Sequence, residues 1–467
     1  MSVSQDCLWS RLSAGGPLAR RFLRAAAAGV VLSNLERASI LGQRHKELRG
    51  RSVLIATDEQ LTAALALIEL DGIAGQLVLC PPGQSIEELR ATAKEAHADA
   101  WIVDRADPDD IPTDLGRVLW CNHELKARVA PLERPESTEW VLLTSGTTGA
   151  AKLVSHSLSS LADPVQRPQP PTRGTTWGTC YDIRRYGGLQ ILLRALLGGG
   201  SLVLSDPVES VREFLTRAAA SKVTHLTGTP SHWRRILMSG FGQLITPEYV
   251  RLSGEIADQQ ILDNLRTTYP AANIVHAFAS TEAGLAFEVT DGLEGFPQDA
   301  VGQAGSGVEI LVEDGAMLIR SARTASRYLN HDALPLRRDD GFVNTHDLVQ
   351  LRDGRYHFVG RHGGVINIGG LKCHPEEIES VINRHPRVRM SLVKARKSPL
   401  LGSVVVAEVV LSIDGASTPS EGAREAIRRE IMESCRRALS AHKVPATIRI
   451  VPSLEVAPSG KLRRPNA

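Results

Sequence analysis

The sequence predicts an α/β protein with a large N-terminal part and a small C-terminal part, and three observations support this prediction. Helical and strand-like patterns alternate through the first third with short loops, which is typical of mixed or parallel sheets flanked by helices. From residue 302 to residue 358 the pattern changes to short strands with Gly and Asp turns, which indicates a β-rich subdomain. The residues after this subdomain contain helices and strands of their own, so we expect a separate α+β unit there.

Each expected element follows from the spacing of apolar residues. A short apolar run between turn residues predicts a buried strand, and an apolar repeat of three to four residues predicts a helix. Strands are expected at 52–57, 76–80, 100–103, 140–143, 223–226, 274–278, 404–411 and 447–451. Helices are expected at 58–70, 85–96, 376–384 and 421–439. Asp58 is a possible N-cap of the helix 58–70. The stretch 191–204 is expected to hold a helix followed by a strand. The Pro-rich stretch 166–173 predicts a surface loop.

The composition indicates a soluble globular protein. Of 467 residues, 42% are hydrophobic and 23% are charged, which excludes a disordered or a collagen-like chain. The net charge of +2 favours neither nucleic acid nor an anionic membrane as a partner. The six scattered cysteines form no C-x-x-C pair. The apolar run Ala25–Leu32 is too short for a membrane span, so a cytoplasmic location is expected.

A loop of glycine and hydroxyl residues follows the strand 140–143. Its residues are Thr144, Ser145, Gly146, Thr147, Thr148 and Gly149. Glycines let backbone N–H groups close around an oxyanion, hydroxyls add donors, and Lys152 adds a positive charge, so the loop suits a polyphosphate. The Walker pattern is absent because Leu153 follows the lysine, and composition alone also fits a flexible polar loop.

The order T-S-G-T-T-G-x-x-K closely resembles the phosphate-binding signature of the adenylate-forming superfamily, which includes acyl-CoA synthetases, peptide-synthetase adenylation domains and luciferases. Four further segments resemble motifs of this family in the family's order. The segment 278–282 resembles its aromatic-Gly-x-Thr-Glu motif. The resemblance implies that Phe278 stacks on adenine, that Thr281 contacts a phosphate or the substrate carboxylate, and that Glu282 binds Mg²⁺, which prefers oxygen ligands. Gly254 and Glu255 stand where the family contacts adenine. A strand leading into a helix capped by Thr281 is the alternative for 278–282.

The segment 340–348 resembles the family's D-G-W-F-x-T-G-D-L motif, with His346 where glycine is usual. This resemblance implies that Asp347 holds the ribose hydroxyls, whereas D-D-G alone indicates only a turn. Gly360-Arg361 and the segment 366–379 resemble the family's inter-domain hinge. This match implies a large domain at 1–360 and a small mobile domain at 361–467. It also implies a ribose or phosphate contact for Arg361, a hinge at Gly363, and a place near the thiol for Gly369 and Gly370.

The segment 458–463 resembles the family's closing motif, whose lysine is catalytic, so the resemblance assigns that role to Lys461. The implied reaction has two steps. A carboxylate attacks the α-phosphorus of ATP to give acyl-AMP and pyrophosphate, and a thiol then attacks the acyl-AMP. Glu282 and Thr281 join Lys461 as catalytic residues, and ATP, Mg²⁺ and CoA are the implied cofactors. The small domain rotates between the two steps.

The acid pocket is the least determined part of the site. Arg185 aligns with a position where acyl-CoA synthetases carry His and amino-acid-activating domains carry Asp, so an α-ammonium group is disfavoured. Gly188, Thr229 and His232 complete the expected pocket. Arg184 or Arg185 could pair with a second anionic group on the acid or with CoA phosphates. Alternatively, both are surface arginines.

Three functions remain open at this point. The first is a ligase that joins a small carboxylic acid to CoA. The second is an enzyme that transfers its acyl-AMP to the phosphopantetheine of a carrier protein. The third is a non-catalytic binding or scaffold protein with a decayed site, against which the retained Lys152, Glu282, Asp347, Arg361 and Lys461 argue.

Overall fold

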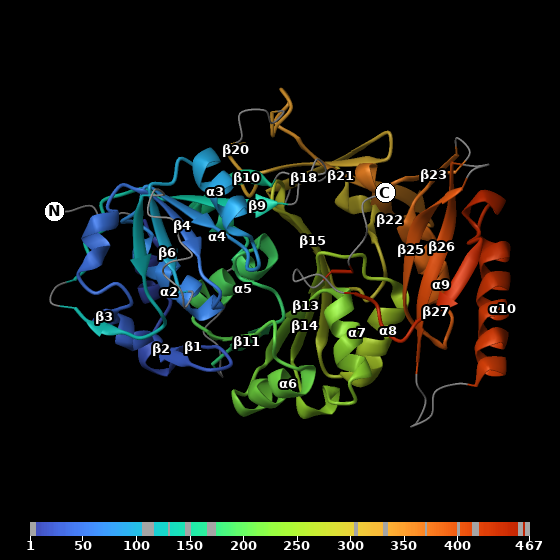
Figure 1. Ribbon diagram of the computed structural model, residues 1–467, viewed down its shortest axis with the longest axis horizontal. Helices are drawn as coiled ribbons and strands as arrows, with labels where there is room; N and C mark the ends of the chain where they lie inside the picture. The colour runs from blue at the N-terminus through green and yellow to red at the C-terminus, as the bar shows by residue number, and fades with distance from the viewer. Residues whose placement is uncertain are drawn as a thin grey trace.

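A large lobe with three β-sheets is followed by a small C-terminal lobe in the computed structural model of the chain (Figure 1). The structure describes residues 6–104, 116–128, 131–144, 151–165, 174–302, 307–329, 335–368, 371–398, 402–412, 420–455 and 461–462. The expected loop at 166–173 lies outside these residues. The overall α/β class with a separate small lobe matches the sequence prediction.

The first sheet has eight strands and is mostly parallel. In spatial order its strands are β16 (Gly284–Val289), β15 (Asn273–Ser280), β14 (Tyr249–Ser253), β13 (His225–Gly228), β11 (Thr176–Thr179), β12 (Ser201–Leu204), β1 (Phe22–Arg24) and β2 (Gly29–Val31). Only the two edge pairs, β15–β16 and β1–β2, are antiparallel. The carboxyl ends of β13, β14 and β15 therefore meet at one edge of the sheet, where α/β proteins bind their ligands.

The second sheet has seven strands and mixed directions. In spatial order they are β20 (Arg327–Tyr328), β10 (Lys152–Ser157), β9 (Glu139–Thr144), β5 (Gln76–Leu79), β4 (Ser52–Ala56), β6 (Ala100–Val103) and β7 (Arg117–Trp120). The short pair β3 (Ala38–Ser39) and β8 (Lys126–Ala127) stands apart. β9 and β10 are antiparallel neighbours, so the chain between them returns on itself. That segment is the Gly- and hydroxyl-rich loop, and residues 145–150 of it lie outside the described part of the chain.

Ten α-helices cover and join the sheets in the described part of the chain. They are α1 (Leu8–Ala14), α2 (Gln60–Leu70), α3 (Ile86–Glu95), α4 (Leu158–Ala162), α5 (Tyr186–Leu197), α6 (Val211–Ala220), α7 (Pro230–Met238), α8 (Gln259–Thr268), α9 (Pro375–Asn383) and α10 (Glu421–Ala438). Every residue of α2 is buried, and α2 and α5 share one apolar core with strands of both sheets. A helix that is apolar on all sides fits such a position between two layers.

The structure corrects three local expectations. The helix expected at 58–70 begins at Gln60, and its N-cap residue is Glu59 rather than Asp58. The helix expected within 191–204 begins earlier, at Tyr186. After β15 the chain forms a hairpin with β16 instead of entering a helix, so Thr281 is not a helix cap.

The β-rich subdomain is a third, antiparallel sheet that packs beside the first. Its strands in spatial order are β17 (Phe296–Pro297), β22 (Arg355–Arg361), β21 (Val343–Arg352), β19 (Ala316–Ser321) and β18 (Val308–Glu313). The small lobe contains α9 and α10 with the strands β23 (Ile366–Ile368), β24 (Leu371–Cys373), β25 (Val388–Ser398), β26 (Gly402–Leu411) and β27 (Thr447–Ile450). Its apolar core includes only residues from Ile366 onward, as an independently folded unit requires.

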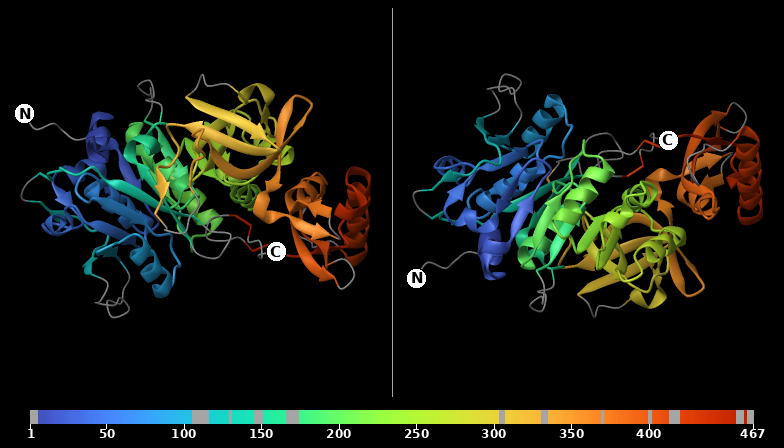
Figure 2. Two further views of the ribbon diagram at one scale, coloured as in Figure 1. Left: turned by 90° about the horizontal axis from the view of Figure 1, so that it is seen from above. Right: turned by 90° about the horizontal axis from the view of Figure 1, so that it is seen from below.

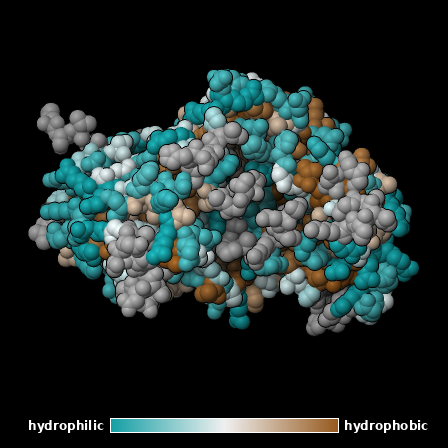
Figure 3. All heavy atoms as spheres, turned by 45° about the horizontal axis from the view of Figure 1, so that its top comes forward, coloured by the Kyte–Doolittle hydropathy of each residue, from teal (hydrophilic) through white to brown (hydrophobic). Residues whose placement is uncertain are grey.

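Hydrophilic residues cover most of the face shown in Figure 3, with apolar residues scattered among them. No helix in the described part of the chain combines the length and the apolar character needed to cross a membrane. Both views in Figure 2 show the end of the chain returning from the small lobe to the middle of the molecule. This return brings the last described residues to the edge of the first sheet.

Candidate active site

Loops at the carboxyl ends of β13, β14 and β15 form one side of the site. Gly254 directly follows β14 and has a φ of +86°, a left-handed conformation that glycine adopts without steric cost. The position that a Cβ atom would occupy on Gly254 is 3.4 Å from Cε of Lys461 and 3.8 Å from Cγ2 of Thr229. The structure therefore brings together three residues expected in the site from sequence.

Glu255 holds the C-terminal tail against the large lobe. Its Oε1 accepts a hydrogen bond from the backbone N–H of Leu462 at 3.1 Å and from the hydroxyl of Ser231 at 3.0 Å. Its Oε2 accepts from the backbone N–H of Ser231 at 2.9 Å. The sequence reasoning assigned an adenine contact to Glu255, and in the structure this carboxylate is the anchor that positions Lys461.

Lys461 lies among charged groups from three parts of the chain. The residue retains exposed surface, but its amino group lies close against protein. This desolvation lowers the pKa of Lys461, the positive charges of Arg361 and Arg185 act in the same direction, and Glu255 and Asp347 oppose the shift. A lysine between carboxylates and arginines at a sheet edge is placed to interact with a negatively charged reaction centre.

The second sheet supplies the opposite side of the site. The hydroxyl of Thr144 donates to Oε1 of Glu282 at 3.4 Å, which joins the end of β9 to the turn after β15. Nζ of Lys152 lies 5.0 Å from the ring centroid of Tyr328, and the pKa of Tyr328 is raised by burial and by its neighbour Glu282. Thr144, Lys152 and Glu282 thus lie around a common position, as the polyphosphate prediction requires. Ser145, Gly146, Thr147, Thr148 and Gly149 lie outside the described residues, as do Gly369 and Gly370.

The side-chain oxygen atoms of Glu282 and Thr144 fit a Mg²⁺ ion. Magnesium in nucleotide sites is held by one or two carboxylates together with phosphate oxygens and water. Glu282 offers one carboxylate beside the hydroxyl of Thr144. The remaining ligands would come from the phosphates and from water, so the donor set is chemically adequate.

One residue beside Thr281, His156, was not found from the sequence. His156 on β10 is buried, and its Nε2 donates to the backbone oxygen of Thr281 at 2.7 Å. Burial lowers the pKa of His156 to about 4, so the ring is neutral and its proton is fixed on Nε2 by the carbonyl. Tyr186 packs against this ring with 5.8 Å between the centroids. His156 belongs to no recognisable motif, so no sequence signal pointed to it, whereas Tyr186 lies in the stretch expected to line the acid pocket.

Asp347 and Arg361, for which the sequence predicts ribose or phosphate contacts, lie side by side in the structure. They lie opposite each other on β21 and β22, with 3.3 Å between Nε of Arg361 and Oδ1 of Asp347. Nη2 of Arg361 also donates to the backbone oxygen of Thr345 at 3.0 Å. His346, between Thr345 and Asp347 in sequence, has a φ of +60°, so it adopts the glycine-like conformation at a cost of about 1–2 kcal/mol. The unusual histidine therefore leaves the backbone path of the motif intact.

The ionisation of Asp347 predicts a pH dependence for nucleotide binding. Burial raises the pKa of Asp347 to about 6, although Arg361 and Lys461 oppose this shift. Below that pH the carboxyl is protonated and accepts hydroxyl hydrogen bonds less strongly. We expect the KM for ATP to rise as the pH falls from 7 to 5, and the Asp347→Asn variant to lose this dependence. Steady-state kinetics of pyrophosphate release check both, and a wild-type KM independent of pH would contradict the prediction.

The raised pKa of Asp347 affects folding stability in the opposite direction to nucleotide binding, because it favours the folded state at low pH. The folded state favours protonated Asp347, so this group makes the protein less stable as the pH rises from about 4 to about 6. A fall in ATP affinity at low pH therefore cannot be a consequence of Asp347 destabilising the fold there.

Phe278 occupies the expected place at the end of β15, but its ring is already packed. It stacks with Phe287 at a centroid distance of 5.8 Å and with Phe358 at 5.2 Å. Adenine stacking by Phe278 remains a prediction. Gly363, the expected hinge, lies in an exposed turn, His362–Gly364, between the β-rich sheet and the small lobe.

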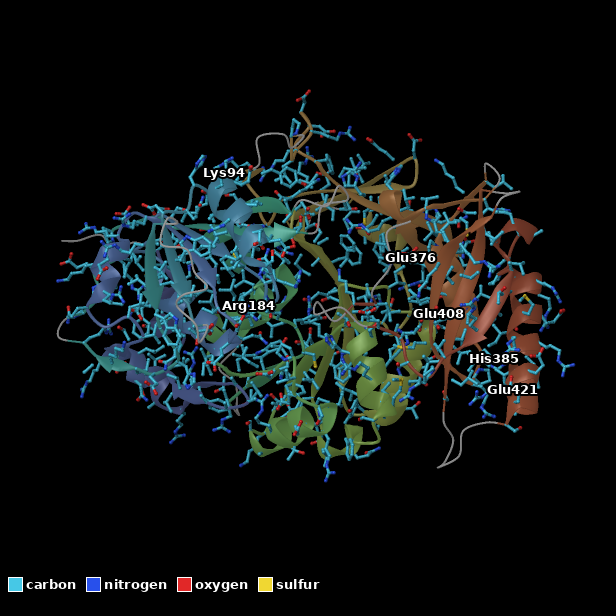
Figure 4. All side chains as sticks on the ribbon, viewed as in Figure 1. Lys94, Arg184, Glu376, His385, Glu408 and Glu421 are labelled. Carbon is cyan, nitrogen blue, oxygen red and sulfur yellow. The ribbon has the colours of Figure 1, made fainter. Side chains whose placement is uncertain are left out.

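The two neighbouring arginines of the acid pocket have different environments, and neither is a surface residue. Arg184 is completely buried (Figure 4), and it binds Asp182 through Nε at 2.8 Å and through Nη2 at 2.5 Å. It also donates to the backbone oxygens of Thr57 and Asp58. The expectation that Arg184 faces the substrate or the solvent is therefore wrong, because all its partners are internal.

Arg185 is half-buried at the N-cap of α5, and its Nε is buried without a hydrogen-bond partner among the described residues. Gly188 admits no side chain, since a Cβ there would lie 2.1 Å from the backbone oxygen of Asp182. Thr229 and His232 cap the start of α7 reciprocally, and burial lowers the pKa of His232 to about 4. The expected acid pocket thus combines one accessible cation with neutral walls.

The comparisons with known proteins agree with this geometry. The model of the AMP-binding enzyme family matches residues 25–328, and the model of its C-terminal domain matches residues 377–461. Tyrocidine synthase 3 of Brevibacillus parabrevis is 23% identical over 89% of this chain, which spans 7% of that protein. The 2-succinylbenzoate–CoA ligase of Staphylococcus epidermidis is 24% identical over 70% of this chain and 69% of its own length.

Similarity to solved structures extends over both lobes. The structure of ATP-bound MatB from Rhodopseudomonas palustris has a TM-score of 0.77 and 21% identity, and the match covers 97% of this chain and 96% of that one. At this identity the match shows a shared fold. Because the two family models together cover most of the sequence, the chain belongs to the family of AMP-binding enzymes, which are adenylate-forming.

Proposed function

We propose that this protein activates a small carboxylic acid with ATP and transfers the acyl group to coenzyme A. The observation that carries the proposal is the position of Lys461 beside Gly254, Glu255 and Asp347, because Glu282, which binds Thr144, also acts electrostatically on Asp347. A lysine in this position stabilises the extra negative charge that builds up when a carboxylate attacks a phosphate. The similarity to 2-succinylbenzoate–CoA ligases supports CoA as the acceptor.

The first step forms one bond and breaks one. A carboxylate oxygen bonds to the α-phosphorus of ATP, and the bond from that phosphorus to the bridging oxygen breaks, so pyrophosphate leaves with the electron pair. Lys461 and Arg361 interact with the charge on the α-phosphate, while Thr144 and Lys152 hold the departing phosphates. Asp347 accepts hydrogen bonds from the ribose hydroxyls. When bound at Glu282, Mg²⁺ would neutralise part of the phosphate charge.

The second step joins the acyl group to sulfur. The thiol loses its proton to solvent, its sulfur attacks the acyl carbon, and AMP leaves with the electron pair of the broken acyl–oxygen bond. Lys461 belongs to the small domain and has no task in this step, because the proposed movement of that domain takes it away from the phosphate. We propose that the small domain, 361–467, moves about Gly363 between the steps and brings Gly369 and Gly370 to the thiol.

Pyrophosphate release tests the proposal directly. The protein is incubated with ATP and Mg²⁺ and with a panel of aliphatic, aromatic and dicarboxylic acids, with and without CoA. We expect acid-dependent pyrophosphate release and an acyl-CoA product. Accumulation of acyl-AMP while CoA remains unused would identify a carrier protein as the acceptor. No release with any acid would contradict the proposal and favour the non-catalytic alternative.

A further inference from the structure

Two arginines share one carboxylate on the face of the first sheet that α5 crosses. Nη2 of Arg194, on α5, lies 2.8 Å from Oε1 of Glu288, on β16. Nη1 of Arg251, on β14, binds the same oxygen. The exposed side-chain fractions are only 16% for Arg194 and 5% for Arg251. Buried arginines normally have one anionic partner each, because an uncompensated buried charge is costly.

The surrounding groups do not supply the second negative charge. Arg323, the other cation that acts on Glu288, is itself paired with Asp163 at 2.7 Å. Tyr249 offers Nη1 of Arg251 only a hydroxyl oxygen, at 3.4 Å. Nε of Arg194 is buried and has no hydrogen-bond partner in the described part of the chain. The cluster therefore holds one positive charge in excess and one unused donor.

The strand register connects this cluster to the reaction centre. Ser253, Ala277 and Glu288 lie side by side on β14, β15 and β16 and so share one face of the sheet. Arg251 is two residues before Ser253 and faces the same way, because alternate residues of a strand share a face. Gly254, which contacts Lys461, is three residues from Arg251, which corresponds to roughly 10 Å along the strand.

The length of helix α5 relates Lys461 to the arginine pair in a second, independent way. Its N-cap residue, Arg185, acts electrostatically on Lys461, and Arg194 lies near its other end against Glu288. Their separation of nine positions in sequence corresponds to about 13 Å of helix. Lys461 thus lies near one end of α5 and the two arginines lie near its other end, on the sheet face that α5 crosses. Ser253 and Ala277, between the ends, are small.

We propose that the activated acid carries a second anionic group, and that Arg194 and Arg251 bind it at the end of the acid site remote from Lys461. This inference rests on the proposed function and specifies its substrate class. The ligand is an acid with two carboxylates separated by a spacer of several carbons. One carboxylate reacts with ATP, and the other supplies the charge that the two arginines share with Glu288.

Matched acids test the inference. Pyrophosphate release is measured with dicarboxylic acids from succinate to suberate, and with the monomethyl ester of each, which keeps the length but removes one charge. The wild-type protein is expected to prefer one diacid over its monoester by about 10- to 100-fold in kcat/KM, as loss of a charge-assisted hydrogen bond predicts. The Arg194→Gln variant is expected to lose this preference, mainly through a higher KM for the diacid, with turnover of the monoester retained.

The control is Arg217→Gln, a change of equal chemistry in an arginine with a side-chain exposure of 15% that pairs with Glu209 at 2.6 Å. It is expected to keep the diacid preference. Equal use of diacids and monoesters by the wild-type protein would overturn the inference but would leave the ligase proposal unaffected. This comparison needs only the wild-type protein, so it is valid even if Arg194→Gln fails to fold. Equal losses for both acids in Arg194→Gln would also overturn it, because a structural role predicts that result. Absence of pyrophosphate release with every acid would instead reject the ligase proposal.

Discussion

Replacing Lys461 with alanine is expected to lower the rate of acyl-AMP formation by about 10²- to 10³-fold, as removal of one preorganised charge-stabilising group does in other active sites. The amino group lies beside the Gly254 turn and is surrounded by Glu255, Asp347 and Arg361. The rate is measured as ATP- and acid-dependent pyrophosphate release.

The second half-reaction shows whether a loss of activity in Lys461→Ala comes from the catalytic role of the lysine or from misfolding. If Lys461 acts in the first step only, the Lys461→Ala protein converts synthetic acyl-AMP and CoA to acyl-CoA at the wild-type rate. Lys394→Ala is a matched control, since Lys394 pairs with Glu408 at 2.6 Å within the sheet of the small lobe. A variant that loses both half-reactions equally would argue against the specific role of Lys461.

Replacing Arg184 with glutamine is expected to destabilise the protein by about 3–5 kcal/mol, the usual cost of breaking a buried ion pair from one side. Asp182 would remain buried without its cation, and the backbone oxygens of Thr57 and Asp58 would lose a donor. The measurement is the midpoint of urea unfolding, interpreted with an unchanged slope.

Arg320→Gln is the comparison for this experiment, because Arg320 forms an exposed ion pair with Glu309. Its loss is expected to cost less than about 1 kcal/mol. Similar midpoints for the two variants would show that Arg184 contributes no more than a surface arginine. A stable Arg184→Gln protein with altered acid preference would restore the substrate role that the structure denies to Arg184.

The motif residues could be predicted because each motif is a characteristic order of residue types within one short stretch of the chain. The Thr144–Lys152 loop, Glu282, Asp347, Arg361 and Lys461 were identified from sequence, and the described ones meet at one site. The strands and most helices were also predictable, because apolar periodicity reflects burial within a single element. The start of α5 was not, because Tyr186, Gly187 and Gly188 before the apolar run gave no helical signal.

Contacts between distant segments could not be predicted in this way. Arg184 and Arg185 are equivalent in sequence, and only the approach of residues 57 and 58 determines which of them is buried. Arg194, Arg251 and Glu288 come from a helix and two strands, and no spacing rule connects them. Glu255 was recognised by position, but its bond to the amide of Leu462 depends on a tail 207 residues further along the chain.

That bond between Glu255 and Leu462 has a consequence for repeated turnover. If the small domain moves as proposed and the tail withdraws, the carboxylate loses one donor but keeps two from Ser231, so no orphaned acceptor is left behind. The donor that leaves is a backbone N–H, which water satisfies at once. Undocking therefore creates no unsatisfied group on either surface, and Lys461 can enter and leave the site without a large energetic barrier imposed by its own anchor.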